Sequence, residues 1–289
     1  MGELAALGCA VLWAGSTVAM RSQTGRVPVL ALNATRALFA SLIYLVVLVV
    51  LGRQGDVLLV PAAALGGLLG SVLVGMALGD SLHIRAMALI GVSRALPISS
   101  TYPILTALLA VVWLGEPLSW RVVLGIFLVV GGVYLVAFPR VRGAVERTPP
   151  PSAHGIVLSL VVAACWALSI VTVKPVLAYV DPLTANGVRL PAALLILLGL
   201  SWRSEGFGNP LRFGRRATLA LALAGSISGL SGALWLFSVQ EAGAAKSAAL
   251  SSTAPIFAAP LAALFLGERL SAQIALGTAL SVAGIWLVL

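Results

Sequence analysis

The chain has 289 residues, of which 60% are hydrophobic and 9% are charged, and its mean hydropathy is +1.09. Soluble domains do not have this composition, so the sequence excludes a soluble globular protein and predicts an integral membrane protein. The net charge of +9 does not indicate nucleic-acid binding, because the basic residues lie mostly in short connections between apolar segments, as the positive-inside rule expects.

The apolar segments, taken in chain order, predict ten membrane spans. A helix needs about 20 mostly apolar residues to cross the hydrocarbon core of a bilayer. Segments of this kind lie near residues 4–20, 29–51, 62–89, 94–114, 120–138, 155–174, 183–202, 217–240, 245–266 and 271–288. The N-terminus lacks the basic region of a signal peptide, so we expect the first segment to be retained as a span. The predicted fold class is an all-α integral membrane protein with ten transmembrane helices.

Two of these segments are longer than a membrane core requires, and both contain glycines spaced four residues apart. Gly75 and Gly79 lie in the third segment, and Gly225 and Gly229 lie in the eighth. Small residues at this spacing allow helices to approach closely, and an overlong span must tilt or break. We therefore expect the third and eighth helices to be tilted or broken near these glycines.

The connections between the segments are mostly short. The exception is residues 139–153, which carry several arginines and three consecutive prolines and which we interpret as a linker. Gly115-Glu116 and the similar Gly267-Glu268 are typical of tight turns between helices.

The order of the polar residues repeats once along the chain. With a shift of 153 positions Asn33 falls on Asn186 and Arg36 on Arg189, and nearer the end of each half the shift is 152. Leucine and alanine matches are expected by chance in this composition, but ordered matches of Trp, Asn, Arg, Pro and Glu are not. The other pairs are Trp13 with Trp166, Ser16 with Ser169, Arg21 with Lys174, Pro103 with Pro255, Gly125 with Gly277, Gly132 with Gly284, and Leu-Gly-Glu-x-Leu-Ser at 114–119 with the same motif at 266–271.

An odd number of spans in each copy makes the second copy start on the opposite side of the membrane, so the repeats are inverted. We predict a first five-span unit at residues 1–138, a linker at 139–153 and a second five-span unit at 154–289. Inverted repeats typify secondary transporters whose site lies between the halves. The basic residues after spans 1, 5 and 7 place these connections in the cytoplasm, and thus both termini outside.

Asp80 is the one acidic residue well inside a predicted span, and His83 follows it one helical turn later. An ionisable side chain at the centre of a membrane helix costs about 2.5–3.5 kcal/mol on insertion scales, so it requires an explanation. The two side chains could form a proton-responsive or ligand-binding pair, or a buried polar pair that bonds to neighbouring helices. The second repeat has Gly232 and Trp235 at these positions, so the two sides of a central cavity would differ.

Asn33, Arg36, Asn186 and Arg189 lie in the first half of spans 2 and 7. Their recurrence suits a cavity, but long arginine side chains near helix ends commonly extend to the membrane interface and fix the depth of the helix. We favour this structural interpretation and do not count them among the binding residues.

A polar run followed by a proline occurs in spans 4 and 9, and each run follows a basic residue, Arg94 or Lys246. A proline inside a span removes a backbone hydrogen bond and bends the helix, and neighbouring hydroxyls can satisfy the freed carbonyl groups. We expect hinges at Pro103 and Pro255, with the polar runs also lining a cavity. The runs are Ser99, Ser100, Thr101 and Tyr102 in the first repeat and Ser251, Ser252 and Thr253 in the second.

Trp13 and Trp166 fall near the middle of spans 1 and 6, too deep for an interfacial aromatic belt, and Ser16 and Ser169 follow them by one turn. An indole offers a ligand an apolar face and one hydrogen-bond donor. We therefore expect these residues to line a central cavity, with Trp235 as a further apolar wall.

Several familiar chemistries are missing from the sequence. It contains no Walker loop, no dinucleotide fingerprint and no clustered metal ligands, and it has two histidines in all. Cys9 and Cys165 lie inside apolar segments, where we interpret them as packing residues. A Ser/His/Asp enzyme would be accompanied by a nucleophile elbow, which is absent. We expect no enzymatic activity, no metal and no cofactor.

These features resemble the drug/metabolite transporter superfamily, and its EamA-type members in particular. The resemblance rests on two five-span repeats, an arginine in the second span of each (Arg36, Arg189), a proline in the fourth (Pro103, Pro255) and the turn at Leu114–Ser119 with its second copy. It implies a basket in which spans 1–4 and 6–9 surround a central cavity, with spans 5 and 10 packed outside. It also implies alternating access and, in many members, export of amino acids or related metabolites.

Two transport mechanisms of this superfamily have little support in the residues of this chain. Four-span multidrug relatives use a membrane-embedded glutamate in the first span to couple protons to cationic drugs, but spans 1 and 6 here contain no acidic residue. Sugar-phosphate exchangers hold phosphate with basic residues in the cavity. Only Arg94 and Lys246 were candidates for that role, and both lie near span ends.

The sequence thus predicts a monomeric, multi-pass transporter of the bacterial inner membrane that exports small metabolites, with amino acids as the expected substrates. Its partners would be the substrate and the lipid bilayer, and not nucleic acid. A multidrug exporter in which Asp80 pairs with cations is the first alternative, and a non-transporting membrane scaffold is the second. The predicted substrate-binding residues are Trp13, Ser16, Asp80, His83, Arg94, Ser99, Ser100, Tyr102, Trp166, Ser169, Trp235, Lys246, Ser251 and Ser252, and the predicted hinges are Pro103 and Pro255.

Overall fold

The computed structural model describes residues 1–23, 26–90, 92–137, 152–204, 214–254, 256–257 and 272–288. The regular elements within these ranges are helices, as the composition predicts. The first half contains α1 (Gly2–Arg21), α2 (Val29–Val50), the short 3-10 helix η1 (Asp56–Leu59), α3 (Ala62–Ser71), the π-helix η2 (Val72–Gly79), α4 (Asp80–Ile90), α5 (Val92–Ser99), α6 (Tyr102–Leu109), the π-helix η3 (Ala110–Leu114) and α7 (Trp120–Ala137).

The second half follows the same plan. It contains α8 (Ala153–Val173), the 3-10 helix η4 (Lys174–Ala178), α9 (Pro182–Ser204), α10 (Arg215–Ala242), α11 (Ala244–Ser251) and α13 (Ala272–Val288). Within the described ranges the helices fall into ten segments at the predicted positions, and six of them are long and apolar enough to cross a membrane. The predicted all-α membrane fold is confirmed. The predicted linker lies outside the described residues up to position 151.

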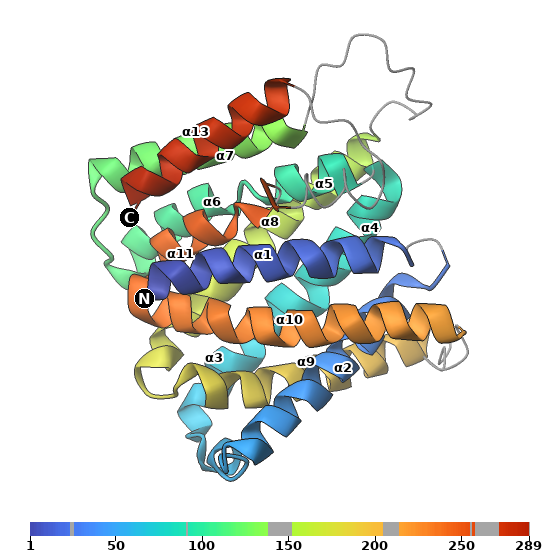
Figure 1. Cartoon of the computed structure of the whole chain (residues 1–289). Coiled ribbons are helices and arrows are strands. Elements are labelled where there is room, and N and C mark those ends of the chain that lie inside the picture. The colour runs from blue at the N-terminus through green and yellow to red at the C-terminus, as the bar shows by residue number, and fades with distance from the viewer. Residues whose placement is uncertain are drawn as a thin grey trace.

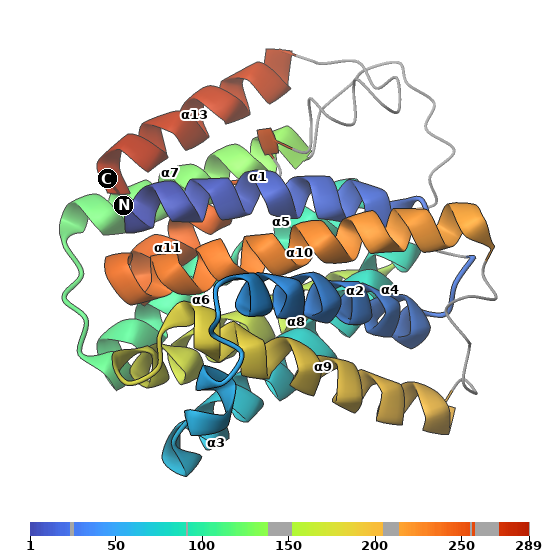
Figure 2. The ribbon, with the colours of Figure 1, turned by 60° about the horizontal axis from the view of Figure 1, so that its bottom comes forward.

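Helices related by the repeat run in opposite directions through the bundle (Figure 1). The last spans of the two repeats show this clearly: α7 begins at the end of the bundle that holds the N-terminus, whereas α13 ends there. Figure 2 shows the same arrangement after a rotation, with the start of the chain and the end of α13 side by side. The two halves are therefore inverted copies, and the chain returns to the end at which it began.

The two last spans, α7 and α13, pair with each other against the outer side of the bundle (Figure 1). Their close approach depends on glycines that the repeat had paired. A Cβ atom on Gly125 would lie 2.8 Å from the backbone oxygen of Gly284, and one on Gly132 would meet the backbone of Gly277. Because no side chain fits at Gly125, Gly132 or Gly284, these glycines allow the backbones of the two helices to come into contact.

The third predicted span is irregular at its glycines, but the eighth is not. The π-helix η2 includes Gly75 and Gly79, so the expected irregularity is confirmed there. By contrast α10 is one continuous α-helix through Gly225 and Gly229, so of the two alternatives, tilt or break, the break is excluded. A Cβ atom on Gly225 would lie 2.5 Å from the backbone oxygen of Arg36, so this glycine serves helix contact. Packing of α10 against α1 and α2 outweighs the low helix propensity of glycine.

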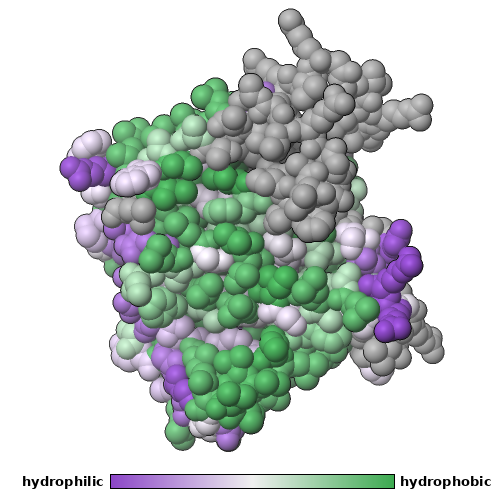
Figure 3. All heavy atoms as spheres, viewed as in Figure 1, coloured by the Kyte–Doolittle hydropathy of each residue, from purple (hydrophilic) through white to green (hydrophobic). Residues whose placement is uncertain are grey.

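The outer surface of the bundle is apolar across its middle, and hydrophilic residues gather towards its two ends in the view of Figure 3. Large apolar side chains on different helices point outwards, for example Val46 (55% exposed), Phe127 (59%) and Leu195 (69%). Soluble monomers rarely expose an apolar surface of this extent. In a bilayer the lipid chains cover it, so the protein is a multi-pass membrane protein.

The predicted turn between spans 4 and 5 connects the two halves. Gly115 has a φ of +65°, a left-handed conformation that favours glycine. The carboxylate of the next residue, Glu116, accepts a hydrogen bond from the backbone N–H of Ala244 at 2.9 Å, at the start of α11. An acidic group at a helix N-terminus accepts hydrogen bonds from the free backbone N–H groups and interacts favourably with the positive end of the helix dipole. The second copy of the turn, Gly267-Glu268, lies outside the described residues.

A second connection between the halves is an ion pair where α9 begins. Arg53, which follows α2, donates hydrogen bonds to both carboxylate oxygens of Asp181 at 3.2 and 2.8 Å. The Thr184 hydroxyl donates to the same carboxylate at 2.7 Å. Partial burial raises the pKa of Asp181, but the hydrogen bonds from Arg53 and Thr184 outweigh burial and hold the pKa below its ordinary value of 3.8.

We expect Asp181→Asn to lower the free energy of unfolding by less than about 1 kcal/mol, because both side chains of the ion pair are more than a third exposed. Since folding lowers the pKa, this stabilisation is present above pH 3.8 and is lost as the pH falls through the lower folded-state pKa. The measurement is thermal unfolding of wild type and variant in detergent across a pH series. The two midpoints should converge at the acid end, and a difference that stays constant would contradict the assignment.

Candidate functional site

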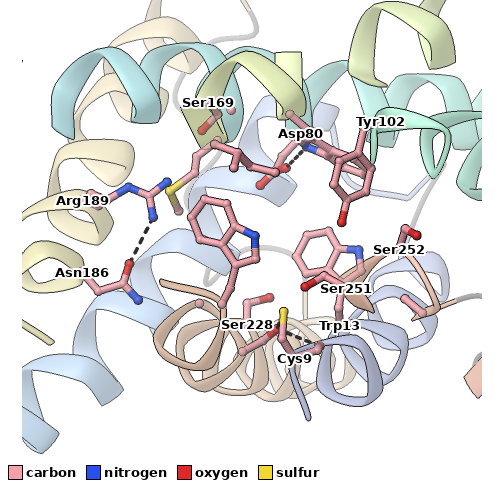
Figure 4. A pocket seen from close by; sticks show the side chains of 18 of the residues that line it. Cys9, Trp13, Asp80, Tyr102, Ser169, Asn186, Arg189, Ser228, Ser251 and Ser252 are labelled. Carbon is pink, nitrogen blue, oxygen red and sulfur yellow. Dashed lines mark hydrogen bonds between the residues drawn. The ribbon is translucent and has the colours of Figure 1, made fainter. Parts of the chain in front are cut away.

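A cavity of about 150 Å3 lies at the centre of the bundle, between the two halves (Figure 4). Its walls come from α1, α2, η2, α4, α5 and α6 of the first half and from α8, α9, α10 and α11 of the second. A water molecule needs about 10–15 Å3 of cavity volume. The cavity of about 150 Å3 therefore has room for about ten waters or for one small metabolite.

Most of the residues predicted to bind substrate line this cavity. They are far apart in the chain, and the packing of one repeat against the other brings them together. The repeat-paired Trp13 and Trp166, for example, stand edge to face with ring centroids 6.2 Å apart. The predicted residues found in the lining are Trp13, Asp80, Ser100, Tyr102, Trp166, Ser169, Trp235, Ser251 and Ser252.

Three predicted residues, Ser16, His83 and Ser99, are buried outside the cavity, where they connect helices. The Ser16 hydroxyl donates to the backbone oxygen of Ala224 in α10 at 2.9 Å. His83 Nδ1 and the Ser99 hydroxyl lie 3.3 Å apart and link α4 to α5. These side chains do not line the cavity because their helices turn them towards neighbouring helices.

Of the two basic residues predicted at the start of spans 4 and 9, Lys246 is described, and it is not part of the described cavity lining. Lys246 lies at the start of α11 with its Nζ 3.8 Å from a carboxylate oxygen of Glu3, at the end of the bundle. The side chain of Arg94 lies outside the described residues, and so does Pro255. Lys246 is therefore placed to join α11 to α1 and not to meet a ligand in this cavity.

Spans 4 and 9 are interrupted at the predicted polar runs. α5 ends at Ser99 and α6 begins at Tyr102, with Pro103 in its first turn. α11 ends at Ser251, and the Ser252 hydroxyl donates to a backbone oxygen one turn earlier at 2.8 Å. Near the break in span 9, a hydroxyl thus satisfies a backbone carbonyl group. The hinge role of Pro103 stays a prediction.

The Asp80 carboxylate is bound by groups from two other helices. Arg36 Nη2 in α2 lies 2.6 Å from Asp80 Oδ2, and the indole N–H of Trp166 in α8 donates to Oδ1 at 3.0 Å. Arg36 also donates to Asn33 Oδ1 at 2.8 Å. The side chains of the ion pair are 4% and 12% exposed. This agrees with the alternative in which Asp80 and His83 bond to neighbouring helices, but the two do not pair with each other, because Asp80 turns towards Arg36 on α2 and His83 towards Ser99 on α5.

Arg189 occupies the repeat-related place in α9, but its partners are neutral. Its Nε donates to Ser71 Oγ at 3.1 Å, its Nη1 donates to Asn186 Oδ1 at 3.4 Å, and its guanidinium lies 5.0 Å from the ring centroid of Trp235. Arg189 and Arg36 are each 3% exposed. The expectation that these arginines extend to the membrane interface is wrong, since the bundle interior supplies their hydrogen-bond and aromatic partners.

The cavity combines an excess of positive charge with aromatic walls. Two arginines and one aspartate line it, which leaves one net positive charge in the described lining. Tyr102 stands edge to face against Trp166 at 5.7 Å, near Trp13. Figure 4 shows Arg189 on one side of the cavity and the hydroxyls of Ser251 and Ser252 on the other. Such a lining suits a small ligand that has both apolar and polar parts.

Some residues of the lining were not predicted as binding residues. Arg36, Asn186 and Arg189 line the cavity, although the sequence predicts them as repeat-related residues that fix helix depth at the interface. Cys9, which the sequence predicts to be a packing residue, also lines the cavity, together with its hydrogen-bond neighbour Ser231 at 3.3 Å. The signal that would have found the arginines is the repeated Asn-x-x-Arg within a span, because an interfacial anchor has no need of an asparagine one turn earlier.

A central cavity between two inverted five-helix repeats, in a bundle with a lipid-facing surface, defines a membrane transporter. The EamA-like transporter family model matches residues 1–138 and 153–289, and the chain belongs to this family. An uncharacterized transporter of Archaeoglobus fulgidus is 28% identical over 286 residues, which cover 99% of this chain and 97% of that protein. A protein crystal structure shares the fold with a TM-score of 0.77 at 19% identity, over 99% of this chain and 96% of that one. The predicted resemblance is thus confirmed.

Proposed function

We propose that this protein exports small metabolites, with amino acids as its principal substrates, by rocking one five-helix repeat against the other. The observation that carries the proposal is the cavity at the contact of the two repeats, which both halves line with charged, hydroxyl and aromatic side chains. A site that both repeats share can open to either side as they move, which is the basis of alternating access.

The chemistry of the lining supports a small polar substrate with an apolar part. Aromatic faces contributed by Trp13 and Trp166 suit an apolar side chain or an ammonium group. Buried charge and hydroxyls suit the polar groups of an amino acid. In this proposal the protein acts as a monomer in a bacterial inner membrane, with the substrate and the lipid bilayer as its partners.

Export of cationic drugs is less well supported. That alternative requires Asp80 to be available to a cation, but Arg36 already lies 2.6 Å from its carboxylate. The net positive charge of the described lining would also repel a cation in a medium of low dielectric constant.

The test is counterflow transport into proteoliposomes that contain the purified protein and an unlabelled amino acid. We expect radiolabelled amino acids to accumulate faster than in protein-free liposomes, and Trp166→Ala to abolish the effect because it removes a cavity wall. Arg216→Gln, an exposed change at the start of α10, should transport normally. Uptake of lipophilic cations without any amino-acid counterflow would overturn the proposal.

A further inference from the structure

The two repeat-related arginines of the cavity differ in their charge partners. Arg36 is held by the Asp80 carboxylate at 2.6 Å. No described carboxylate lies within 4.0 Å of Arg189, and no described acceptor bonds to its Nη2. A buried guanidinium without a carboxylate is costly in a membrane protein. The second half of the cavity therefore has a positive charge that its own residues leave unneutralised.

The origin of this difference is one position in the repeat. The residue that corresponds to Asp80 is Gly232, which lines the cavity next to Asn186. A Cβ atom on Gly232 would lie 3.0 Å from Asn186 Nδ2. An acidic side chain occupies this position in the first half, whereas the second half has none there, and an added side chain would crowd Asn186.

The asparagines that accompany the arginines differ in the same way. Asn33 Nδ2 donates to the backbone oxygen of Met76 and to Ser81 Oγ, both at 3.0 Å. Asn186 Nδ2 is buried, in a residue that is only 1% exposed, and makes no hydrogen bond of 3.5 Å or less to a described residue. A buried donor without an acceptor costs free energy that an incoming acceptor would recover. Figure 4 shows Asn186 and Arg189 together on one side of the cavity.

We infer that Arg189 and Asn186 form a subsite for the carboxylate group of the transported molecule. This inference rests on the proposed function, since it assigns one part of that substrate to one part of the site. The planar guanidinium offers paired N–H donors that match a carboxylate, and Asn186 Nδ2 adds a third donor. Trp235, 5.0 Å from the guanidinium carbon, fixes its plane.

The charge balance favours a carboxylate over a phosphate. One net positive charge remains in the described lining, and a monoanionic carboxylate neutralises it. A phosphate dianion would leave a negative charge inside an apolar bundle, which is unfavourable. The ammonium group of an amino acid would then lie towards the aromatic rings and the hydroxyls across the cavity, where Trp13 and Ser251 stand.

The experiment measures binding to the full-length protein in detergent by thermal shift and titration calorimetry. The probes are L-leucine, 4-methylpentanoate, which keeps the carboxylate and lacks the ammonium, L-leucinamide, which keeps the ammonium and lacks the carboxylate, and inorganic phosphate. We expect the two carboxylates to raise the melting temperature and the amide and phosphate to leave it unchanged, because a ligand stabilises only the state that binds it.

Two pairs of variants test the subsite. Arg189→Gln should weaken carboxylate binding by about tenfold or more, as loss of a charged hydrogen bond does, whereas the exposed change Arg216→Gln should not. Gly232→Asp keeps Arg189 but supplies the missing acid, and should abolish carboxylate binding. Its matched control Gly232→Asn has nearly the same size without the charge, so it measures the cost of crowding Asn186 and should bind carboxylates more tightly than Gly232→Asp. Size-exclusion chromatography checks that each variant is folded.

The outcomes separate the subsite from the proposed function. Carboxylate binding that persists in both Arg189→Gln and Gly232→Asp overturns the subsite, and so does stabilisation by phosphate or by L-leucinamide instead of the carboxylates. Failure of every carboxylate to bind the wild-type protein overturns it as well. Amino-acid counterflow that continues unchanged in Arg189→Gln overturns the subsite alone, whereas carboxylate binding without any counterflow overturns the proposed function and leaves the subsite standing.

Discussion

Replacing Arg36 with glutamine is expected to lower the free energy of unfolding by about 3–5 kcal/mol, because it leaves the Asp80 carboxylate buried without its cation. The two side chains are 4% and 12% exposed, so bulk water does not surround the carboxylate that the change leaves without its cation. The indole N–H of Trp166 still donates to Asp80 after the change, but a single neutral donor does not offset a full charge. The measurement is the unfolding midpoint in detergent, by heat or by titration with a denaturing detergent.

The matched comparison for Arg36→Gln is the double variant that also carries Asp80→Asn. Removing both charges removes the cost of burying them, so the double variant should be more stable than Arg36→Gln alone. If the losses of stability caused by the two single changes simply add in the double variant, the ion pair at 2.6 Å does not stabilise the protein in the way we describe.

Arg189→Gln provides a comparison from the other repeat. It strands no carboxylate among the described residues, so it should cost less stability than Arg36→Gln.

Replacing Gly225 with leucine is expected to cost about 3 kcal/mol of stability by overpacking the contact of α10 with α2. A Cβ atom there would lie 2.5 Å from the backbone oxygen of Arg36 and 2.7 Å from Cβ of Phe39, distances at which the helices must separate. Because Arg36 belongs to this stretch of α2, the separation should also disturb the cavity, and amino-acid counterflow should fall together with the unfolding midpoint.

The control for this prediction is Gly199→Leu in α9, where an added Cβ atom would meet nothing within 4 Å. Leucine forms helices better than glycine, and an outward-facing leucine contacts lipid, so this variant should be as stable as wild type or more so. Equal losses at both positions would mean that glycine is needed for a reason other than close packing, and would contradict our account of α10.

The spans and the repeat could be predicted from the sequence because both depend on local composition and order. A run of about 20 apolar residues is the length that a helix needs to cross the membrane, so it predicts a transmembrane helix. Ordered matches such as Asn33 with Asn186 follow from the sequence alone, and an odd number of spans then requires inversion. The turn at Gly115 could also be predicted from the sequence, because glycine is the residue that most readily adopts the positive φ found there.

The partners of buried side chains could not be predicted in the same way. Asp80 and His83 are one helical turn apart, which makes them neighbours on an isolated helix. In the bundle Asp80 instead contacts Arg36, 44 positions earlier, and Trp166, 86 positions later. A contact between helices depends on how far each helix is rotated about its axis, and apolar sequence on every side of a membrane helix does not specify that rotation.

The cavity residues illustrate the same limit. The mid-span depth of Trp13 and Trp166 was enough to indicate a cavity, and both line it. The depth of Arg189 was misread, because snorkelling to the interface and hydrogen bonding inside the bundle are equally compatible with a place in the first half of a span. The hydrogen bonds from Arg189 to the buried neutral residues Ser71 and Asn186 show that its side chain stays inside the bundle.

The sequence by itself thus determined that this protein folds in a membrane, the positions of its membrane spans and the inverted relation of its halves, because these depend on hydropathy and on order along the chain. The tertiary structure alone decided which charges meet. It paired Asp80 with Arg36 and left Arg189 with neutral partners, because contacts between helices are set by packing across the whole bundle and not by neighbours in the chain.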